Sequence, residues 1–208
     1  YGITATGRMR LQAEGNLYGL GTGSAAMLSS GSDMRLISGG SIYSNAQRSD
    51  RSNGAMRVSV GGTLGGSASG DINVFAATGD MKLDQLSSSA GKVTLTALQG
   101  SILNGGGTTR NIVADQVNLS VGNGSGGTTT IANNNLGSLL STLSLQTQRL
   151  QAQTLTYNRS IIAIDNVGDL SVEGAQVGSE GTLLLRTVGA MNLASDVGVG
   201  CKGLIRLE

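Results

Sequence analysis

The sequence contains no histidine, no proline and no tryptophan, and its 208 residues include one cysteine, one phenylalanine and four tyrosines. Without histidine, the common zinc sites and the Ser-His-Asp and Cys-His catalytic groups cannot form. Cys201 has no partner for a disulfide within the chain, so we expect a buried thiol, with an intermolecular disulfide as the alternative. No apolar run approaches the roughly 18 residues of a membrane-spanning helix.

Charge is sparse and nearly balanced, with 14 basic and 13 acidic side chains and a net charge of +1. No field of one sign therefore favours nucleic acid or a membrane surface as the partner. Glycine is abundant, at 34 residues, but it has no three-residue period and proline is absent, which excludes collagen. The apolar fraction of 38% disfavours disorder.

A short unit recurs along the whole chain: a small turn residue, a spacer, and then an apolar, a variable and an apolar residue. Its first apolar residues are 13 to 27 positions apart, with most spacings near 22. The ten copies are TGRMRL (6–11), GSDMRL (31–36), NGAMRV (53–58), SGDINV (69–74), AGKVTL (90–95), ADQVNL (114–119), LSTLSL (140–145), VGDLSV (167–172), EGTLLL (180–185) and KGLIRL (202–207).

In many units a second short strand follows a glycine-containing corner, as in EGNLYG (14–19) and QGSILN (99–104). Strands this short cannot bury a face alone, so each needs the same strand of the next repeat above it. We therefore predict an all-β fold: a parallel β-helix, or β-solenoid, of about nine to ten coils of ~22 residues, forming one domain over 1–208. Internal strands explain the missing proline, which has no N–H for the ladder.

Two alternatives concern the fold. A tandem antiparallel β-sandwich would use longer strands joined by hairpins, which fits the short units less well. The repeat is loose over 133–165, where leucines at 136–152 fit either strands with a long loop, which we favour, or a short helix.

The units GSDMRLISGGSIYSN, SGDINVFAATGDMKL and AGKVTLTALQGSILNGG resemble the degenerate repeats of filamentous-haemagglutinin-type exoproteins of two-partner secretion. That resemblance implies a right-handed parallel β-helix and a secreted or bacterial cell-surface location. The family's amino-terminal secretion domain carries Asn-Pro-Asn motifs, which this proline-free chain lacks. The resemblance is therefore to the repetitive shaft.

Four aspartates occupy one recurring position, directly before a strand and after Gly or Ser: Asp33, Asp71, Asp80 and Asp169. An aspartate at such a corner can accept a turn N–H, so we interpret them as corner caps and not as a glycosidase carboxylate pair. Asp80 and Asp84, with Lys82 between them, form the only acidic cluster. Neither the nonapeptide of calcium-binding β-rolls nor a phosphate loop is present.

The variable residue between the two apolar positions is arginine in the first three units: Arg10, Arg35 and Arg57. If these coils are adjacent, three guanidinium groups line one face at ~4.8 Å spacing. This is our candidate ligand-binding site, for a polyanion such as a sulfated glycan, lipopolysaccharide or extracellular DNA. The alternative is a solvated face balanced by Glu14, Asp33 and Asp50.

These observations favour a non-enzymatic, extracellular structural or adhesive shaft, without a metal or cofactor. The alternatives are an adhesin that binds polyanions or glycans through an outer sheet, and a polysaccharide-degrading β-helix enzyme. We expect partners that stack end to end, either further repeats or other copies, with surface glycans or other polyanions as further candidates. Because the chain opens at Tyr1 without Met, we expect a processed form or an internal piece of a longer surface protein.

Overall fold

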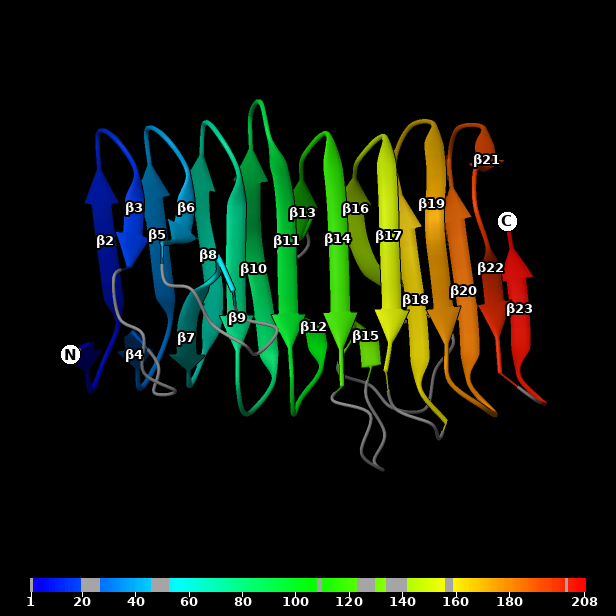
Figure 1. Ribbon diagram of the computed structural model, residues 1–208, viewed down its shortest axis with the longest axis horizontal. Coiled ribbons are helices and arrows are strands. Elements are labelled where there is room, and N and C mark those ends of the chain that lie inside the picture. The colour runs from blue at the N-terminus through cyan, green and yellow to red at the C-terminus, as the bar shows by residue number, and fades with distance from the viewer. Residues whose placement is uncertain are drawn as a thin grey trace.

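The computed structural model describes residues 2–19, 27–45, 53–107, 110–122, 130–133, 142–155, 159–200 and 202–208. Over these ranges the regular structure is entirely β, and the strands of both sheets pair in parallel (Figure 1). They stack as a β-solenoid of about seven turns, with equivalent strands about 23 residues apart. This confirms the predicted fold class. Nothing in the described part of the chain forms an apolar helix long enough to cross a membrane.

Two sheets run along the solenoid, and the chain alternates between them. Sheet A contains twelve strands. They are β1 (Ile3–Ala5), β3 (Leu17–Gly19), β4 (Leu28–Ser30), β6 (Ile42–Ser44), β7 (Met56–Val60), β9 (Ile72–Ala76), β11 (Lys92–Ala97), β14 (Gln116–Val121), β17 (Arg149–Thr154), β19 (Leu170–Val177), β21 (Met191–Leu193) and β22 (Val197–Val199).

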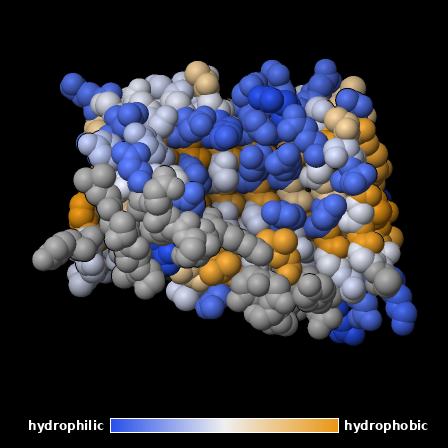
Figure 2. Space-filling model, viewed as in Figure 1, coloured by the Kyte–Doolittle hydropathy of each residue, from blue (hydrophilic) through white to orange (hydrophobic). Residues whose placement is uncertain are grey.

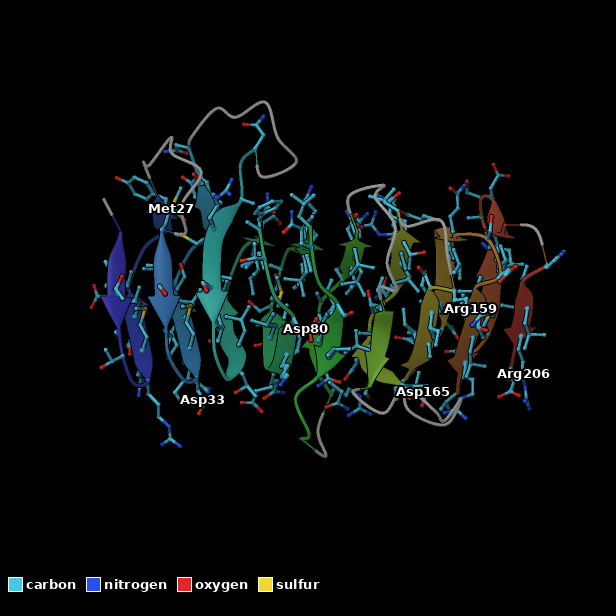
Figure 3. All side chains as sticks on the ribbon, turned by 90° about the horizontal axis from the view of Figure 1, so that it is seen from below. Met27, Asp33, Asp80, Arg159, Asp165 and Arg206 are labelled. Atoms are coloured by element: carbon cyan, nitrogen blue, oxygen red, sulfur yellow. The ribbon has the colours of Figure 1, made fainter. Side chains whose placement is uncertain are left out.

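Sheet B contains eleven strands and closes the other side of each turn. Seen from below, the two sheets form two layers, with Met27 on the side of sheet A and Asp33 and Asp165 on the side of sheet B (Figure 3). The strands are β2 (Met9–Ala13), β5 (Met34–Ser38), β8 (Thr63–Ala68), β10 (Met81–Ser88), β12 (Ile102–Asn104), β13 (Ile112–Val113), β15 (Thr130–Asn133), β16 (Leu143–Gln146), β18 (Ile161–Asn166), β20 (Thr182–Thr187) and β23 (Leu204–Leu207).

The predicted count of nine to ten coils was too high, because the ten sequence units do not all lie on one side of the turn. Met9 and Met34 begin strands of sheet B, whereas Met56 and Ile72 begin strands of sheet A. The short spacing of 13 residues from Leu170 to Leu183 is half a turn between the two sheets.

The core lies between the sheets and consists of aliphatic side chains stacked in register. Ile72, Val93, Val117 and Leu150 are paired in that order, and each is fully buried. Period-2 alternation places every second side chain of a strand inside, so each turn adds a rung to the same column. Burying one such side chain contributes about 1.5–3 kcal/mol, and the neighbouring turns supply the cover.

The corner aspartates are caps, as predicted, and each one caps the next turn of the solenoid. Asp71 Oδ1 accepts the Lys92 N–H at 2.9 Å, and Asp80 Oδ1 accepts the Ser101 N–H at 2.9 Å. Asp33 and Asp169 do the same for the N–H groups of the residues one turn on, Thr63 at 3.0 Å and Ala190 at 2.8 Å. A carboxylate thus bonds a backbone donor at the corner where a strand begins.

Glycine makes room for these caps. A Cβ added at Gly62, Gly91 or Gly189 would come within 2.4, 2.6 and 2.4 Å of the capping oxygens of Asp33, Asp71 and Asp169, respectively. Each of these glycines directly precedes the residue that is capped. The recurring Gly in the sequence unit is therefore a steric requirement of the side chain one turn earlier.

The loose region continues as strand, which confirms the favoured interpretation where the structure describes it. Strands β16, β17 and β18 cover Leu143–Gln146, Arg149–Thr154 and Ile161–Asn166. Residues 134–141, which include the first part of the alternative helix, lie outside the described residues, as does Cys201.

Candidate functional site on the outer face of sheet A

The predicted arginine stripe is shorter than expected. Arg10 and Arg35 are in register on sheet B and both are exposed. The residue paired with Arg35 on the next strand, however, is Gly65. Arg57 lies in β7 of sheet A, so the assumption that the three arginines line one face was wrong. Two guanidinium groups, and not three, share the predicted surface.

Arg57 is buried and contacts an aromatic ring. Its side chain is paired in register with Phe75, and its guanidinium carbon lies 4.9 Å from the centre of that ring. The residue is 4% exposed and Phe75 is fully buried, although Phe75 is outside the aliphatic core cluster. A cation held over a ring in this way stabilises the fold and is unavailable to a large polyanion.

Polar side chains form three columns on the outer face of sheet A, because parallel register places equivalent residues above one another. The near column lies where the strands begin and consists of Lys92, Gln116, Arg149, Ser171 and Asn192. The central column consists of Tyr18, Tyr43, Asn73, Thr94, Asn118 and Gln151. The far column consists of Thr96, Ser120, Gln153 and Gln176.

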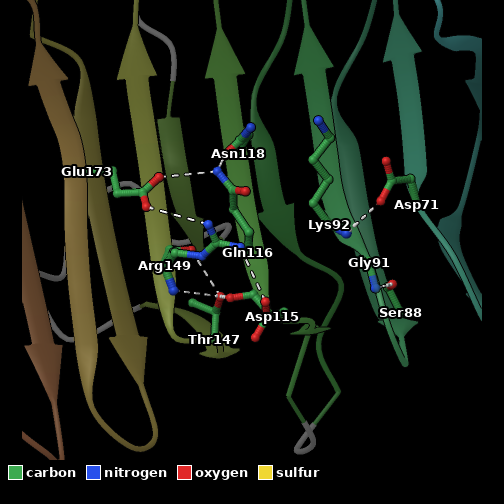
Figure 4. A network of polar contacts seen from close by, with 10 residues as sticks. All are labelled: Asp71, Ser88, Gly91, Lys92, Asp115, Gln116, Asn118, Thr147, Arg149 and Glu173. Carbon is green, nitrogen blue, oxygen red and sulfur yellow. Dashed lines mark hydrogen bonds and ion pairs between the residues drawn. The ribbon is translucent and has the colours of Figure 1, made fainter.

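An ion-pair network joins the near column to its neighbours (Figure 4). Arg149 Nη2 lies 3.3 Å from Asp115 Oδ2, and Arg149 Nη1 lies 3.9 Å from Glu173 Oε1. Gln116 Nε2 donates to Glu173 Oε2 at 3.2 Å and to Asn118 Oδ1 at 3.3 Å. The positive charge of Arg149 is therefore shared between two carboxylates of the chain itself.

A β-bulge places Glu173 in this network. The register between β17 and β19 shifts after Leu150, so that Gln151 is paired with Gly174 and Glu173 has no partner of its own. A bulge redirects a side chain, and here the Glu173 carboxylate reaches across β17 to Gln116 on β14. The departure from regular stacking thus brings an acidic side chain into contact with the near column.

A groove lies between the central and far columns, with a volume of about 600 Å³. Its walls come from β11, β14, β17 and β19, with Ser195 and Asp196 at one end. Figure 2 shows hydrophilic side chains over this part of the surface, with apolar atoms visible in the hollows between them. A second hollow of about 930 Å³ lies beside it, at the corner that includes Asp115, Arg149 and Asp169.

The outer face of sheet B carries a second charged network towards the C-terminal end. Arg186 donates to both oxygens of Asp165, from Nε at 2.5 Å and from Nη2 at 2.7 Å, and Thr142 Oγ1 also donates to Asp165. Burial raises the pKa of Asp165, but the hydrogen bonds from Arg186 and Thr142 and the charge of Arg186 outweigh it and hold that pKa below its ordinary value.

The pKa of Asp33 is also lowered, because the backbone N–H and the hydroxyl of Thr63 both donate to its carboxylate and Arg8 lies 3.2 Å away. Asp80 is a cap, so the sparse acidic cluster with Asp84 supplies no free carboxylate pair at that position. Among the residues that the structure describes, no three His, Cys, Asp or Glu side chains gather as metal ligands do.

Part of the central column follows from the repeat, because Asn73, Thr94 and Asn118 are the variable residues of successive units and are paired in that order. The near and far columns and Gln151 were not predicted, because the unit either leaves those positions unspecified or does not include them. Runs such as KVTLTA, QVNLSV and RLQAQT show the alternation from which the columns could have been read. Comparison with family models, curated protein sequences and solved structures finds no match for the chain. The resemblance to filamentous-haemagglutinin-type repeats thus stays a prediction.

Proposed function

We propose that the chain is a non-enzymatic structural module: a rigid solenoid shaft that spaces or presents other elements on the outside of a bacterial cell. The observation that carries this proposal is the unbroken parallel pairing of strands in both sheets along the solenoid. Each turn is bound to the next by backbone ladders, stacked aliphatic rungs and corner caps. Such an assembly resists bending because a bend would open all three sets of contacts together.

The ends of the solenoid support stacking on further turns, in another copy or in adjoining repeats. Ile205 and Leu207, on the last strand, are 44% and 40% exposed. The residues paired with them one turn earlier, Leu183 and Leu185, are fully buried. At the other end, Ile3 is 54% exposed and its partner Leu28 only 5%. Another turn placed on either end would bury the same kind of apolar rung.

Support for a non-enzymatic role comes from what the acidic side chains do. Asp33, Asp71, Asp80 and Asp169 cap backbone N–H groups, while Asp165 is held by Arg186. A glycosidase needs two carboxylates facing one open space, with one of them free to hold a proton. These carboxylates instead bond backbone N–H groups or an arginine, and so stabilise the shaft.

Rigidity is tested by spin labels at the two ends. We suggest Thr4→Cys on β1 and Asn192→Cys on β21 in a Cys201→Ser background, with pulsed electron paramagnetic resonance to measure the distance distribution. A rigid shaft gives one narrow peak. A broad distribution or several peaks would contradict the structural role, because a flexible chain cannot hold a presented element at a fixed distance.

The proposed secreted or cell-surface location rests on the family resemblance and needs a separate test. Protease treatment of intact cells of the source organism, followed by antibody detection of the chain, distinguishes the locations. Loss of the signal from intact cells supports surface exposure. Protection until the cells are lysed would place the chain inside and remove this part of the proposal.

A second candidate function, polyanion binding, is favoured by one observation. Arg10 and Arg35 are in register and exposed on sheet B, so their guanidinium groups project from neighbouring strands. Two such groups can contact successive sulfate or phosphate groups of a chain. The site is small, and its retention of a polyanion should be weak and salt-dependent.

A further inference from the structure

We propose that the groove on sheet A binds an uncharged polysaccharide that lies along the long axis of the solenoid. This goes beyond the shaft function, because it assigns a ligand to a surface that rigidity alone does not require. The groove crosses four neighbouring strands, β11, β14, β17 and β19. At a strand spacing of about 4.8 Å it extends roughly 14 Å, long enough for several sugar rings.

The groove walls offer both donors and acceptors. Thr94, Asn118 and Gln151 line one side, and Ser120, Gln153 and Gln176 line the other. Within the described part of the chain, no hydrogen bond engages the side-chain amides of Gln151 and Gln176. An amide both donates and accepts, as a sugar hydroxyl does, so these side chains suit a ligand rich in hydroxyl groups.

Charge selects against anions. The described residues that line the groove include no lysine and no arginine, while Glu173 and Asp196 are both acidic. The cations of the near column are Arg149, which is held between Asp115 and Glu173, and Lys92, and neither lines the groove. A nucleic acid or a sulfated glycan would bring its negative charge towards these carboxylates, whereas an uncharged polysaccharide would not.

A peptide strand is also disfavoured. The strands that form the groove floor are internal, and their backbone groups are bonded to neighbouring strands on both sides. Within the described part of the chain, an added peptide would therefore find no free sheet edge at these strands for strand addition. The available partners are side chains, as in recognition of a sugar.

The central column ends in two tyrosines that extend the same path. Tyr18 and Tyr43 are in register, with ring centres 6.0 Å apart and planes inclined by 26°. Tyr18 is 53% exposed, so an aromatic face is available at that end of the sheet. Aromatic rings present an apolar body for the C–H face of a sugar, together with a polar hydroxyl. At the opposite end Gly174 continues the column without a side chain, and a Cβ there would meet nothing within 4 Å.

The test uses the 208-residue chain and a defined panel of probes: cellohexaose, maltohexaose and laminarihexaose as uncharged oligosaccharides, and dextran sulfate as the charged arm. Saturation-transfer NMR detects binding, and titration calorimetry measures affinity at two salt concentrations. The variant is Asn118→Ala/Gln151→Ala. The matched control is Gln12→Ala/Gln85→Ala, which removes two exposed amides from sheet B. Circular dichroism and thermal unfolding check that both variants are folded.

We expect at least one uncharged hexasaccharide to bind with little dependence on salt, and the groove variant to bind it about tenfold more weakly or not at all. The control variant should bind like the unmodified chain. The proposal is overturned if no uncharged oligosaccharide binds, if a folded groove variant binds unchanged, or if dextran sulfate alone is retained. None of these outcomes changes the spin-label result, so the shaft and the groove can fail separately.

Discussion

Gly91 leaves the space in which the Asp71 carboxylate caps the next turn. A Cβ at position 91 would lie 2.6 Å from Asp71 Oδ1 and 2.7 Å from the Asp71 backbone nitrogen. The same oxygen accepts the Lys92 N–H at 2.9 Å. The two residues are one turn apart in the chain, so the relationship exists only if the turns stack in register.

Gly91→Ala should therefore destabilise the solenoid. The methyl group would push against backbone atoms that cannot rotate away, and overpacking of this kind costs about 1–3 kcal/mol. Urea denaturation measures the change in the free energy of unfolding. Gly15→Ala is the matched control, because a Cβ there meets nothing within 4 Å. Equal effects at the two positions would show that the cap does not require the glycine.

Stability should fall on acidification, and Asp165 should account for part of the loss. The pKa of Asp165 is lowered in the folded state from its ordinary value of 3.8. The stabilisation by its charged form is thus complete above that value and is lost as the pH falls through the lower, folded pKa. The free energy of unfolding, measured between pH 3 and pH 6, should fall less steeply on acidification for Asp165→Asn than for the unmodified chain. Parallel curves for the two proteins would count against this role.

Substitution of Arg57 should lower stability, whereas substitution of the exposed pair Arg10 and Arg35 should weaken polyanion binding. Arg57→Ala removes a buried guanidinium over Phe75 and should lower the free energy of unfolding by about 1–2 kcal/mol. Arg10→Ala/Arg35→Ala should leave stability nearly unchanged and abolish weak retention on heparin resin at low salt. If Arg57→Ala instead abolishes retention in a folded protein, the guanidinium is accessible and the assignment to the fold is wrong.

The exposed end rung should promote end-to-end association. Ile205→Ser/Leu207→Ser makes the last inward-facing rung polar, so sedimentation velocity should show fewer large species as concentration rises. Val188→Ser is the control, because Val188 is 85% exposed at a corner and not on that rung. A concentration series identical for all three proteins would remove stacking between copies from the account.

The fold and the corner caps could be predicted from the sequence because both depend on local pattern. An apolar residue after Gly-Asp marks a strand start, whichever sheet the strand joins. That generality also caused the error at Arg57, since MRV of β7 on sheet A reads like MRL of β2 and β5 on sheet B. The number of residues in each turn would show which sheet a strand joins, but that number varies along the chain. Lys92 is paired with Gln116, 24 positions on, and Gln116 is paired with Arg149, 33 positions on.

The groove could not be predicted from the sequence, because the number of residues per turn varies. Thr94, Asn118 and Gln151 become neighbours only when turns of unequal length are placed in register. The bulge at Glu173 adds one residue to a strand. Gly174 in SVEGAQV is a signal of it, because a glycine inside a strand pattern is typical of a bulge, but that signal does not show which side chains the bulge brings together. Local patterns thus specify which side chains are buried, while the register decides which exposed side chains meet.

In-register stacking is the claim on which the shaft, the caps and the groove all depend. It is tested most directly by a disulfide between Asn118→Cys and Gln151→Cys in a Cys201→Ser background, since these positions are paired on neighbouring strands. The account predicts rapid cross-linking under mild oxidation for this pair, with the fold retained, and none for Asn118→Cys with Ala152→Cys, whose side chains lie on opposite faces of the sheet. Equal cross-linking of both pairs, or cross-linking of the second pair alone, would contradict it.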